Sequence, residues 1–315
     1  MDIVCATDNN FLLYLGVAIC SVCENNRDQD IEFHIIVGED VSEPGKSLLS
    51  EMVGRYGQRM SFYSINESVL KELPVGKPGQ PPHISVAAYY RLFLSTILPE
   101  TVNKVLYLDC DIINVSSLAP LWDTDIDDVA VAAAPDVFEC YDSLYDRLQY
   151  HSELGYFNSG VLLVNLRYWR ENHLQEDFLE FWKQHPERVL YHDQDILNYV
   201  LKERKRVLHL KYNVQEPLLH VVNPLSEKYQ NEVEDALHNP VIMHFTTPAK
   251  PWVRGCRHPW KKEFFEYHRK SGLPKFKLAG RQKISLYWRI RNFCMKFGIG
   301  GHENGYRIDI CSIFS

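Results

Sequence analysis

Two aspartates that follow an apolar strand are the residues whose types and spacing most clearly suggest chemistry. Residues 104–115 read K-V-L-Y-L-D-C-D-I-I-N-V, so a run of strand character leads directly to Asp109 and Asp111. Side chains alternate along a strand, so both carboxylates face the same way at its carboxyl end, the edge where open α/β sheets bind ligands. Two carboxylates this close raise each other's pKa unless a cation lies between them. The pattern favours a divalent metal that also holds a diphosphate, although an isolated D-x-D is more often a solvated turn.

A histidine late in the chain is a candidate third metal ligand. His244 lies in the last apolar strand, at residues 241–245, and the sequence T-T-P-A-K-P-W follows it. A histidine at a strand end is usually only hydrogen-bonded, but imidazole beside two carboxylates suits Mn²⁺ better than Mg²⁺ or Ca²⁺. Lys250 comes six residues after His244 and could neutralise a phosphate.

The chain opens with a buried strand, D-I-V-C-A-T-D, and an apolar helix follows at about residues 11–22. This is the order of a nucleotide-binding βα unit, but without G-x-G-x-x-G, so a dinucleotide cofactor is disfavoured. The small Ala6 and Thr7 would let a flat base approach the strand end. Asp8 could accept a hydrogen bond from a pyrimidine imide, or Asp8 and Asn10 could simply cap the helix.

Alternating strands and helices position these residues. Strands at 31–38 and 61–65 enclose a helix at 43–56, which predicts a mostly parallel sheet with helices on both faces. A further helix is expected at 85–98. Its Arg91 lies among apolar neighbours, so this guanidinium either pairs with an acid or reaches a phosphate.

Polar residues also follow two later strands. Asp136 comes after the strand at 129–134, and Asn158 precedes the strand at 160–165. The two residues share one edge of the sheet if their strands are parallel. The amphipathic segment at 169–184 is expected to be a packing helix.

A helix at 191–200 opens with Asp193, Gln194 and Asp195. Acids at this position suit the helix dipole, which is one interpretation. A sugar-binding group of carboxylate and amide is the functional alternative.

Charge is distributed unevenly along the 315 residues, whose net charge is -7. Residues 250–300 hold 14 Lys and Arg against two acids, a net +12, so the other residues carry -19. Residues 281–299 interleave cations with aromatic and aliphatic side chains, a pattern typical of a helix in a membrane interface with anionic lipids. A packed C-terminal helix is the alternative, and no nucleic-acid-binding motif accompanies the charges, so no nucleic-acid partner is expected.

The start of the chain shows no signal peptide, and no run approaches 18 apolar residues. We therefore expect a protein of the reducing cytoplasm that associates peripherally with the inner face of the plasma membrane. The one C-x-x-C, Cys20 and Cys23, lies in a helical pattern and is interpreted as two buried thiols.

Seven motifs together resemble glycosyltransferase family 8, and within it the bacterial retaining galactosyltransferases that extend lipooligosaccharide. They occur over nearly the whole chain to about Trp260: D-I-V-C-A-T-D-N-N, H-I-S-V-A-A-Y-Y-R-L, K-V-L-Y-L-D-C-D, P-L-W-D-T-D, Y-F-N-S-G-V-L-L-V-N-L, D-Q-D-I-L-N and P-A-K-P-W. The resemblance implies an α/β GT-A fold, Rossmann-like with a mostly parallel sheet flanked by helices. It implies a nucleotide-sugar-binding catalytic domain at 1–250, the C-terminal part of the acceptor side at 251–280, and a basic, helical, membrane-associating tail at 281–315.

The resemblance also assigns site residues. The metal ligands would be Asp109, Asp111 and His244, holding Mn²⁺, with Mg²⁺ as an alternative. The UDP-sugar donor would contact Ala6, Thr7, Asp8, Asn9, Asn10, Arg91, Asp109, Cys110, Asp111, Thr247 and Lys250. Asp136, Asn158, Asp193 and Gln194 would form the catalytic group around the transferred hexose, and His83 would face the acceptor. Thr246 and Thr247 stand where the family carries small residues.

The implied reaction transfers glucose or galactose from a UDP-sugar to a glycan or glycolipid acceptor in lipopolysaccharide or cell-surface polysaccharide assembly, retaining the α configuration. Gln194 occupies the position of a nucleophile in a double displacement, but an amide is a poor nucleophile, so a front-face route is favoured. Two alternatives are a non-catalytic UDP-sugar-binding protein and a metal-dependent nucleotide-sugar hydrolase.

Overall fold

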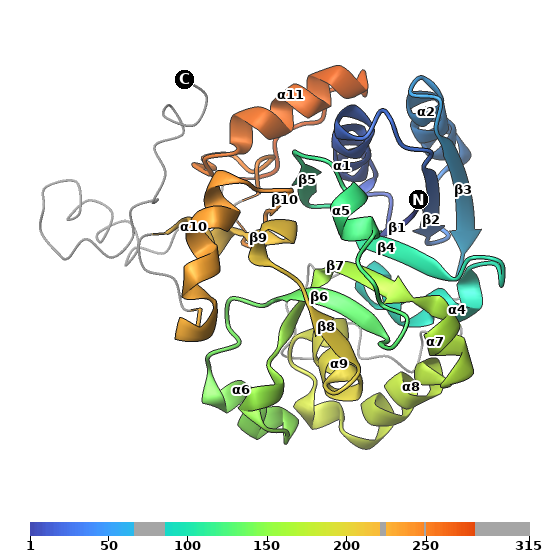
Figure 1. The fold of residues 1–315 in the computed structure, drawn as a ribbon. Helices are drawn as coiled ribbons and strands as arrows, with labels where there is room; N and C mark the ends of the chain where they lie inside the picture. Colours follow the sequence, from blue (N-terminus) through green and yellow to red (C-terminus); the bar gives the residue numbers. More distant parts are fainter. Residues whose placement is uncertain (66–85, 221–224, 249, 281–315) are drawn as a thin grey trace, which may run out of the picture.

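The computed structural model describes residues 1–65, 86–220, 225–248 and 250–280 (Figure 1). His83 and the tail at 281–315 lie outside these residues, so the predictions made for them are not addressed by the structure. Free cysteines include Cys20 and Cys23, and both thiols are buried as expected.

A seven-stranded sheet forms the centre of the molecule, with strand order β3-β2-β1-β4-β7-β6-β8. All neighbours are parallel except β7, which is antiparallel to both β4 and β6. The mostly parallel sheet predicted from the sequence is thus confirmed. The strands are β1 (Asp2–Thr7), β2 (Glu32–Val37), β3 (Arg59–Ser64), β4 (Lys104–Leu108), β6 (Val131–Pro135), β7 (Phe157–Asn165) and β8 (Lys205–Val207).

Helices cover both faces of this sheet (Figure 1). The α-helices are α1 (Leu12–Asn25), α2 (Glu43–Gly54), α4 (Leu94–Ile97), α5 (Ala119–Trp122), α6 (Asp142–Leu148), α7 (Leu166–Glu171), α8 (Leu174–Gln184), α9 (His192–Leu201), α10 (Gln230–His238) and α11 (Lys261–Ser271). The 3-10 helices are η1 (Val86–Phe93), η2 (Ser152–Leu154), η3 (Pro186–Arg188), η4 (Leu210–Tyr212), η5 (Glu216–Leu219) and η6 (Glu227–Tyr229).

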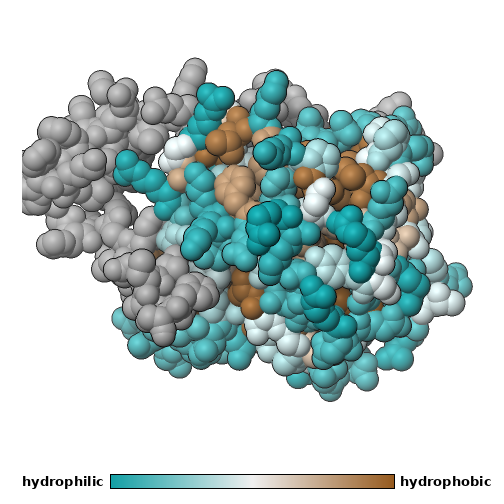
Figure 2. All heavy atoms as spheres, turned by 90° about the horizontal axis from the view of Figure 1, so that it is seen from above, coloured by the Kyte–Doolittle hydropathy of each residue, from teal (hydrophilic) through white to brown (hydrophobic). Residues whose placement is uncertain are grey.

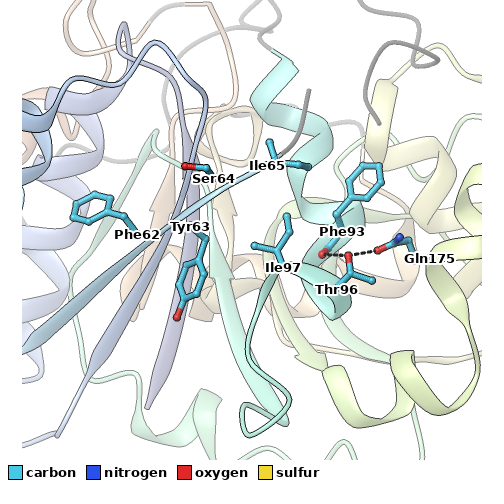
Figure 3. Close-up of a pocket in the computed structure, with 8 residues that line it drawn as sticks. All are labelled: Phe62, Tyr63, Ser64, Ile65, Phe93, Thr96, Ile97 and Gln175. Carbon is cyan, nitrogen blue, oxygen red and sulfur yellow. Dashed lines mark hydrogen bonds between the residues drawn. The ribbon is translucent and has the colours of Figure 1, made fainter. Parts of the chain in front are cut away.

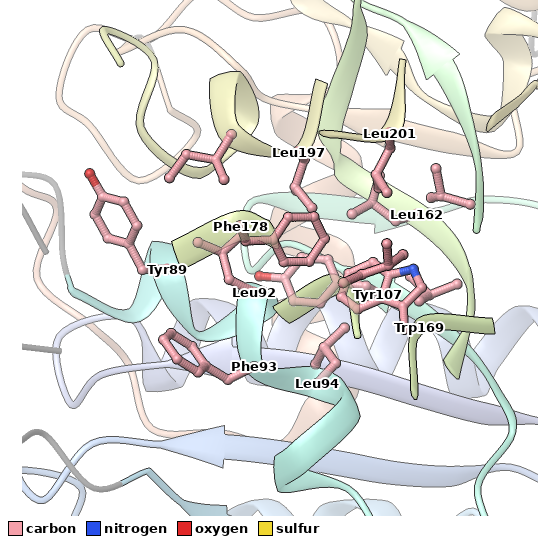
Figure 4. Packing of buried hydrophobic residues seen from close by; sticks show 14 of the residues in the cluster. Tyr89, Leu92, Phe93, Leu94, Tyr107, Leu162, Trp169, Phe178, Leu197 and Leu201 are labelled. Carbon is pink, nitrogen blue, oxygen red and sulfur yellow. The ribbon is translucent and has the colours of Figure 1, made fainter. Parts of the chain in front are cut away.

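Strand β4 shows how the sheet separates two apolar cores. Val105 and Tyr107 face one core, and the alternate residues Leu106 and Leu108 face the other. The first core joins η1 and α7–α9 to the sheet through residues such as Trp169 (Figure 4). The second core lies under α1 and α2. Burial on both faces explains why β4 is a nearly continuous apolar run rather than an alternating one.

A smaller three-stranded sheet carries the histidine candidate. Its order is β5-β10-β9, with β5 at Ile112–Asn114, β10 at Ile242–His244 and β9 at Val214–Gln215. In the antiparallel pairing of β10 with β5, His244 lies opposite Ile112, the residue that follows Asp111. This pairing brings a residue late in the chain to the end of β4.

Two local predictions were wrong. The segment 169–184 is not one helix, because it is divided between α7 and α8 at His173, whose φ is +52°. Histidine is among the residues enriched at positive φ, and Asn172 ends the preceding helix. The helix expected at 85–98 is mostly the 3-10 helix η1, followed by the short α4.

Candidate active site

A cavity of about 140 Å³ lies at the carboxyl ends of β1 and β4. Seven of the residues that line it were predicted to bind the donor, and the other four lining residues were not predicted. Its lining consists of Ala6, Thr7, Asp8, Phe11, Ala87, Ala88, Arg91, Tyr107, Asp109, Cys110 and Asp111. The Cys110 thiol donates to the Ala6 carbonyl at 3.1 Å, which ties the two strand ends together.

The three predicted metal ligands converge beside this cavity. His244 Nε2 lies 3.2 Å from Asp111 Oδ1 and 3.8 Å from Asp109 Oδ2. One ligand atom from each residue lies within 4.8 Å of the others, and the described part of the chain holds no further group of three or more His, Cys, Asp or Glu with this geometry. Two carboxylate oxygens and one imidazole nitrogen are a donor set that suits Mn²⁺.

Strand β7 passes directly behind His244 and Asp109 at Gly160. A Cβ atom at this position would lie 2.2 Å from His244 Cε1 and 2.7 Å from Asp109 Oδ2. Both distances are far below van der Waals contact, so only glycine fits here. The sequence prediction did not single out Gly160, because the apolar pattern of β7 does not show what lies against it.

Two cations neutralise the aspartates. Lys250 Nζ lies 2.5 Å from Asp111 Oδ2 and also donates to the Phe245 carbonyl. Burial alone would raise the pKa of Asp111, but Lys250 and His244 outweigh it and hold this pKa below its usual value. Arg91 Nη2 donates to Asp109 Oδ1 at 2.8 Å.

Arg91 pairs with acids, one of the two roles that the sequence left open, and its contact with the donor remains a prediction. It is buried, and its Nε also lies 3.1 Å from Asp193 Oδ2, so one guanidinium joins the metal-ligand group to helix α9. Burial disfavours the charged guanidinium, but Asp109 and Asp193 outweigh it and raise the pKa of Arg91.

Asp136, Asn158, Asp193 and Gln194, the predicted sugar-side group, also lie together. Asp136 Oδ2 accepts from Asn158 Nδ2 at 2.9 Å and from Gln194 Nε2 at 3.2 Å. Asp136 and Asn158 do lie at one edge of the sheet, but the parallel strand direction from which this was expected was wrong. Because β7 is antiparallel to β6, the start of β7 meets the end of β6.

Burial changes the titration of the acids in this group. It raises the pKa of Asp193 to about 6, against the attraction of Arg91 and together with the repulsion from Asp109. Burial likewise raises the pKa of Asp136, although the hydrogen bond from Asn158 opposes the increase. Ser159 Oγ donates to Asp193 Oδ2 at 3.0 Å and supports its ionised form.

Asp8 holds the turn that leads into α1. Its Oδ1 accepts from the backbone N–H groups of Asn10 at 2.8 Å and Phe11 at 3.0 Å. The Asn9 N–H is bound to Asp40 Oδ2 at 2.9 Å. Contact of these residues with a base therefore remains a prediction. Thr247, three residues after His244, is partly exposed.

Asp195 belongs to the scaffold of this site. Its carboxylate is fully buried and accepts both terminal nitrogens of Arg147, at 2.7 and 3.0 Å, and the Tyr156 hydroxyl at 2.8 Å. The backbone N–H groups of Leu190 and Tyr191 also donate to it, at 2.7 and 2.6 Å. These contacts fix the turn that precedes Asp193 and Gln194.

Two further residues of the site, Asn213 and Ser159, were missed by the sequence prediction. Asn213 Oδ1 lies 3.0 Å from His244 Nδ1, and the Ser159 N–H donates to Gln194 Oε1 at 3.0 Å. The run N-V-Q at 213–215 offered a signal, since two amides flank a buried valine where a short strand begins.

A larger cavity of about 510 Å³ lies elsewhere, beside the edge strand β3 (Figure 3). The described residues that line it include no carboxylate, imidazole, ammonium or guanidinium group. Its polar contacts are local, as Thr96 Oγ1 lies 2.7 Å from Gln175 Oε1 and 3.1 Å from the Phe93 carbonyl oxygen. Size alone therefore does not identify the site.

Comparison with known proteins finds relatives that match most of the chain. The family model described as glycosyl transferase family 8 matches residues 2–256. General stress protein A of Bacillus subtilis is 28% identical over 275 residues, which cover 85% of this chain and 92% of that protein. A lipopolysaccharide 1,2-glucosyltransferase of Escherichia coli is 31% identical over 257 residues, or 80% and 72% of the two chains. The lipopolysaccharide 1,3-galactosyltransferase of Salmonella typhimurium is 28% identical over 276 residues, or 84% and 77%.

The solved structures include one similar to most of this fold. The galactosyltransferase LgtC, in complex with donor and acceptor sugar analogs, superposes with a TM-score of 0.76 at 29% identity. The match covers 92% of this chain and 100% of the LgtC chain.

Proposed function

The chain belongs to glycosyl transferase family 8 and is a glycosyltransferase, and we propose that it moves glucose or galactose from a UDP-sugar to a hydroxyl of a cell-surface glycan. The relatives named as lipopolysaccharide glucosyl- and galactosyltransferases support a hexose donor and a lipopolysaccharide-type acceptor. The likeness to a galactosyltransferase bound to donor and acceptor analogs supports a retaining transfer with the same layout.

One observation carries the proposal: Asp109 belongs at once to the cavity at the carboxyl ends of β1 and β4, to the metal-ligand group and, through Arg91, to the sugar-side group. It lines the cavity, lies beside His244, and shares Arg91 with Asp193. A UDP-sugar has the same three parts in the same order, namely a base with ribose, a diphosphate, and a hexose.

Asp109, Asp111 and His244 would hold Mn²⁺, with Mg²⁺ as an alternative. When bound, this ion supplies positive charge against the departing diphosphate. Lys250 would add a fixed ammonium beside the same group, since it already lies against Asp111. The cavity-lining residues Ala6, Thr7, Asp8 and Cys110, with the adjacent Asn9 and Asn10, would contact the base and ribose, and Thr247 would lie toward the hexose.

The arrangement around Gln194 favours a front-face substitution. Its amide is a poor nucleophile, and both of its polar atoms are occupied by Ser159 and Asp136. Asp195 cannot approach a sugar without breaking its bonds to Arg147. We therefore assign Gln194 and the carboxylates of Asp136 and Asp193 to stabilising positive charge at the anomeric carbon, while the leaving phosphate oxygen accepts the proton of the acceptor.

The domain assignments also remain proposals. We assign 1–250 to catalysis and 251–280 to the acceptor side. His83 and the tail at 281–315, to which acceptor contact and membrane association are assigned, lie outside the described residues. Among the described residues no helix has the length and apolar character needed to cross a membrane. Deletion of the tail tests the proposed peripheral position at the inner face of the plasma membrane.

The decisive experiment measures UDP release with Mn²⁺ across a panel of UDP-sugars, with and without lactose-type and glucosyl acceptors. We expect release with one hexose donor, stimulation by an acceptor, and loss of activity on chelation. Asp111→Asn should lower turnover at least about 100-fold, whereas Asp127→Asn, a change to an exposed acid elsewhere on the chain, should leave it unchanged.

Other outcomes separate the alternatives. UDP release that no acceptor stimulates would indicate a nucleotide-sugar hydrolase. Tight UDP-sugar binding without release of UDP would indicate a binding protein.

A further inference from the structure

A backbone amide at the start of β7 sets the orientation of a buried chain of side-chain amides. The Gly160 N–H can only donate, and it points at Asn158 Oδ1 at 3.0 Å. The Asn158 oxygen is therefore the atom on this side, and its NH₂ group must face Asp136 Oδ2, which lies 2.9 Å away.

The same reasoning carries on to the histidine. Asn158 Oδ1 has a second partner, Asn213, whose Nδ2 donates to it at 2.9 Å. Since the Asn213 NH₂ group is used in this way, its oxygen must be the atom 3.0 Å from His244 Nδ1. An amide oxygen only accepts, so Nδ1 of His244 must carry a hydrogen, and Nε2 is the nitrogen that faces Asp111 and Asp109 and can give its lone pair to a bound metal ion.

We propose that Asn213 is a positioning residue that holds His244 in the Nδ1–H tautomer, and that it joins the metal-ligand group to the sugar-side group in one hydrogen-bonded chain. The chain runs from Asp136 through Asn158 and Asn213 to His244. The inference deepens the proposed function, because it rests on the metal-binding role proposed for His244.

Burial makes this chain rigid. Asn213 is 0% exposed, and His244 and Asp136 are each 4% exposed, so water does not compete for their hydrogen bonds. Gln215 of β9 is also 0% exposed. It joins β9 to the turn at Asp136, because it donates to the Pro135 carbonyl at 2.8 Å and accepts from the Val137 N–H at 3.2 Å. Strand β9 thus holds His244 and Asp136 in fixed relation.

The test begins with ¹⁵N NMR of the histidine side chains in the full-length protein without metal, with the His244 signals assigned by their loss in His244→Gln. We expect Nδ1 of His244 to carry a hydrogen in the unmodified protein. The Nε2–H tautomer there, with no hydrogen on Nδ1, would overturn the proposal without any further variant.

Variants of Asn213 then separate its two hydrogen bonds. Asn213→Ala removes the acceptor, so the Nε2–H tautomer should appear and the affinity for Mn²⁺, measured by electron paramagnetic resonance, should fall about 10–100-fold. Asn213→Asp keeps an acceptor for Nδ1–H but turns an oxygen toward Asn158 Oδ1. It should therefore keep the tautomer and the Mn²⁺ affinity within about threefold while lowering kcat.

Asn165→Ala is the matched control, since Asn165 is a buried asparagine with two hydrogen bonds at the other end of β7. It should change neither tautomer nor Mn²⁺ affinity. An Asn213→Ala protein that keeps both, or an Asn213→Asp protein that loses both, would contradict the proposal. If the tautomer is Nδ1–H but the unmodified protein does not bind Mn²⁺, the proposed metal role fails while the inference about Asn213 stands.

Discussion

At the scale of single residues, Asp193 connects the electrostatics of the site to a measurable pH dependence. Its carboxylate is buried against Arg91, and burial raises its pKa to about 6. We propose that the ionised form stabilises the sugar cation, so kcat should rise with pH through about 6. Asp193→Asn should remove this acidic limb and lower kcat about 100–1,000-fold.

Ser159→Ala tests whether the acidic limb belongs to Asp193. Ser159 Oγ donates to the ionised Asp193, so its removal should raise the pKa of Asp193 and move the acidic limb to higher pH. The pH profile of kcat at saturating donor and acceptor measures both variants. An acidic limb that persists in Asp193→Asn would assign the titration to a different group.

Gly160 defines the space available to the metal ligands. Gly160→Ala would place a methyl group 2.2 Å from His244 Cε1, so either β7 or the His244 side chain must shift. We expect a loss of about 1–3 kcal/mol in stability and about 10–100-fold in Mn²⁺ affinity.

Gly54→Ala serves as the control for this change, because no atom lies within 4 Å of a Cβ at that helical position. Both quantities can be followed by urea unfolding and Mn²⁺ titration. Unchanged Mn²⁺ affinity in Gly160→Ala would show that the ligand group is less constrained than its geometry indicates.

At the scale of elements, the start of α9 is held by a carboxylate rather than by an N-cap. Asp195 is 0% exposed and fixes Arg147 and the turn that precedes the helix. Asp195→Asn leaves the Arg147 guanidinium partly buried without its ion pair, and we expect a loss of about 3–5 kcal/mol in the free energy of unfolding.

Urea unfolding measures this loss, and Asp146→Asn, an exposed acid in α6, should stay within about 0.5 kcal/mol of the unmodified protein. The double variant with Arg147→Met should recover part of the loss, since no unpaired charge remains. A loss in Asp195→Asn no larger than that of the control would show that the turn is held by other contacts.

The elements also show how far sequence reasoning reaches. Strand character and side-chain periodicity predicted the βα order and placed Asp109, Asp111 and Asp136 at strand ends, because burial imposes those patterns locally. The direction of β7 was not predictable in this way, since a run buried on both faces reads the same in either orientation. The contacts of Asn213 and Gly160 depend on which strands become neighbours, and no local pattern encodes that.

At the scale of the whole molecule, charge is separated along the chain. The face that carries α11, α1 and α2 is mostly hydrophilic, with small separate hydrophobic areas (Figure 2). Residues 250–280 hold nine Lys and Arg against two acids, so much of the basic character precedes the tail. A truncated chain would therefore keep some electrostatic attraction to an anionic surface, and the contribution of the tail must be sought in its aromatic residues as well.

Deleting residues 281–315 should then weaken binding to anionic vesicles at least about tenfold, because interfacial anchoring combines apolar burial with attraction to lipid headgroups. Replacing Trp288 and Phe293 by serine in the full chain keeps every charge, and it should weaken binding by a substantial part of the same factor. Turnover on a soluble acceptor should remain unchanged in both proteins, since the site described above lies entirely before residue 281.

Vesicle cosedimentation at two salt concentrations distinguishes the contributions: an aromatic effect persists at high salt, whereas a purely electrostatic one disappears. Full vesicle binding after deletion would move the membrane contact to the basic residues of 250–280.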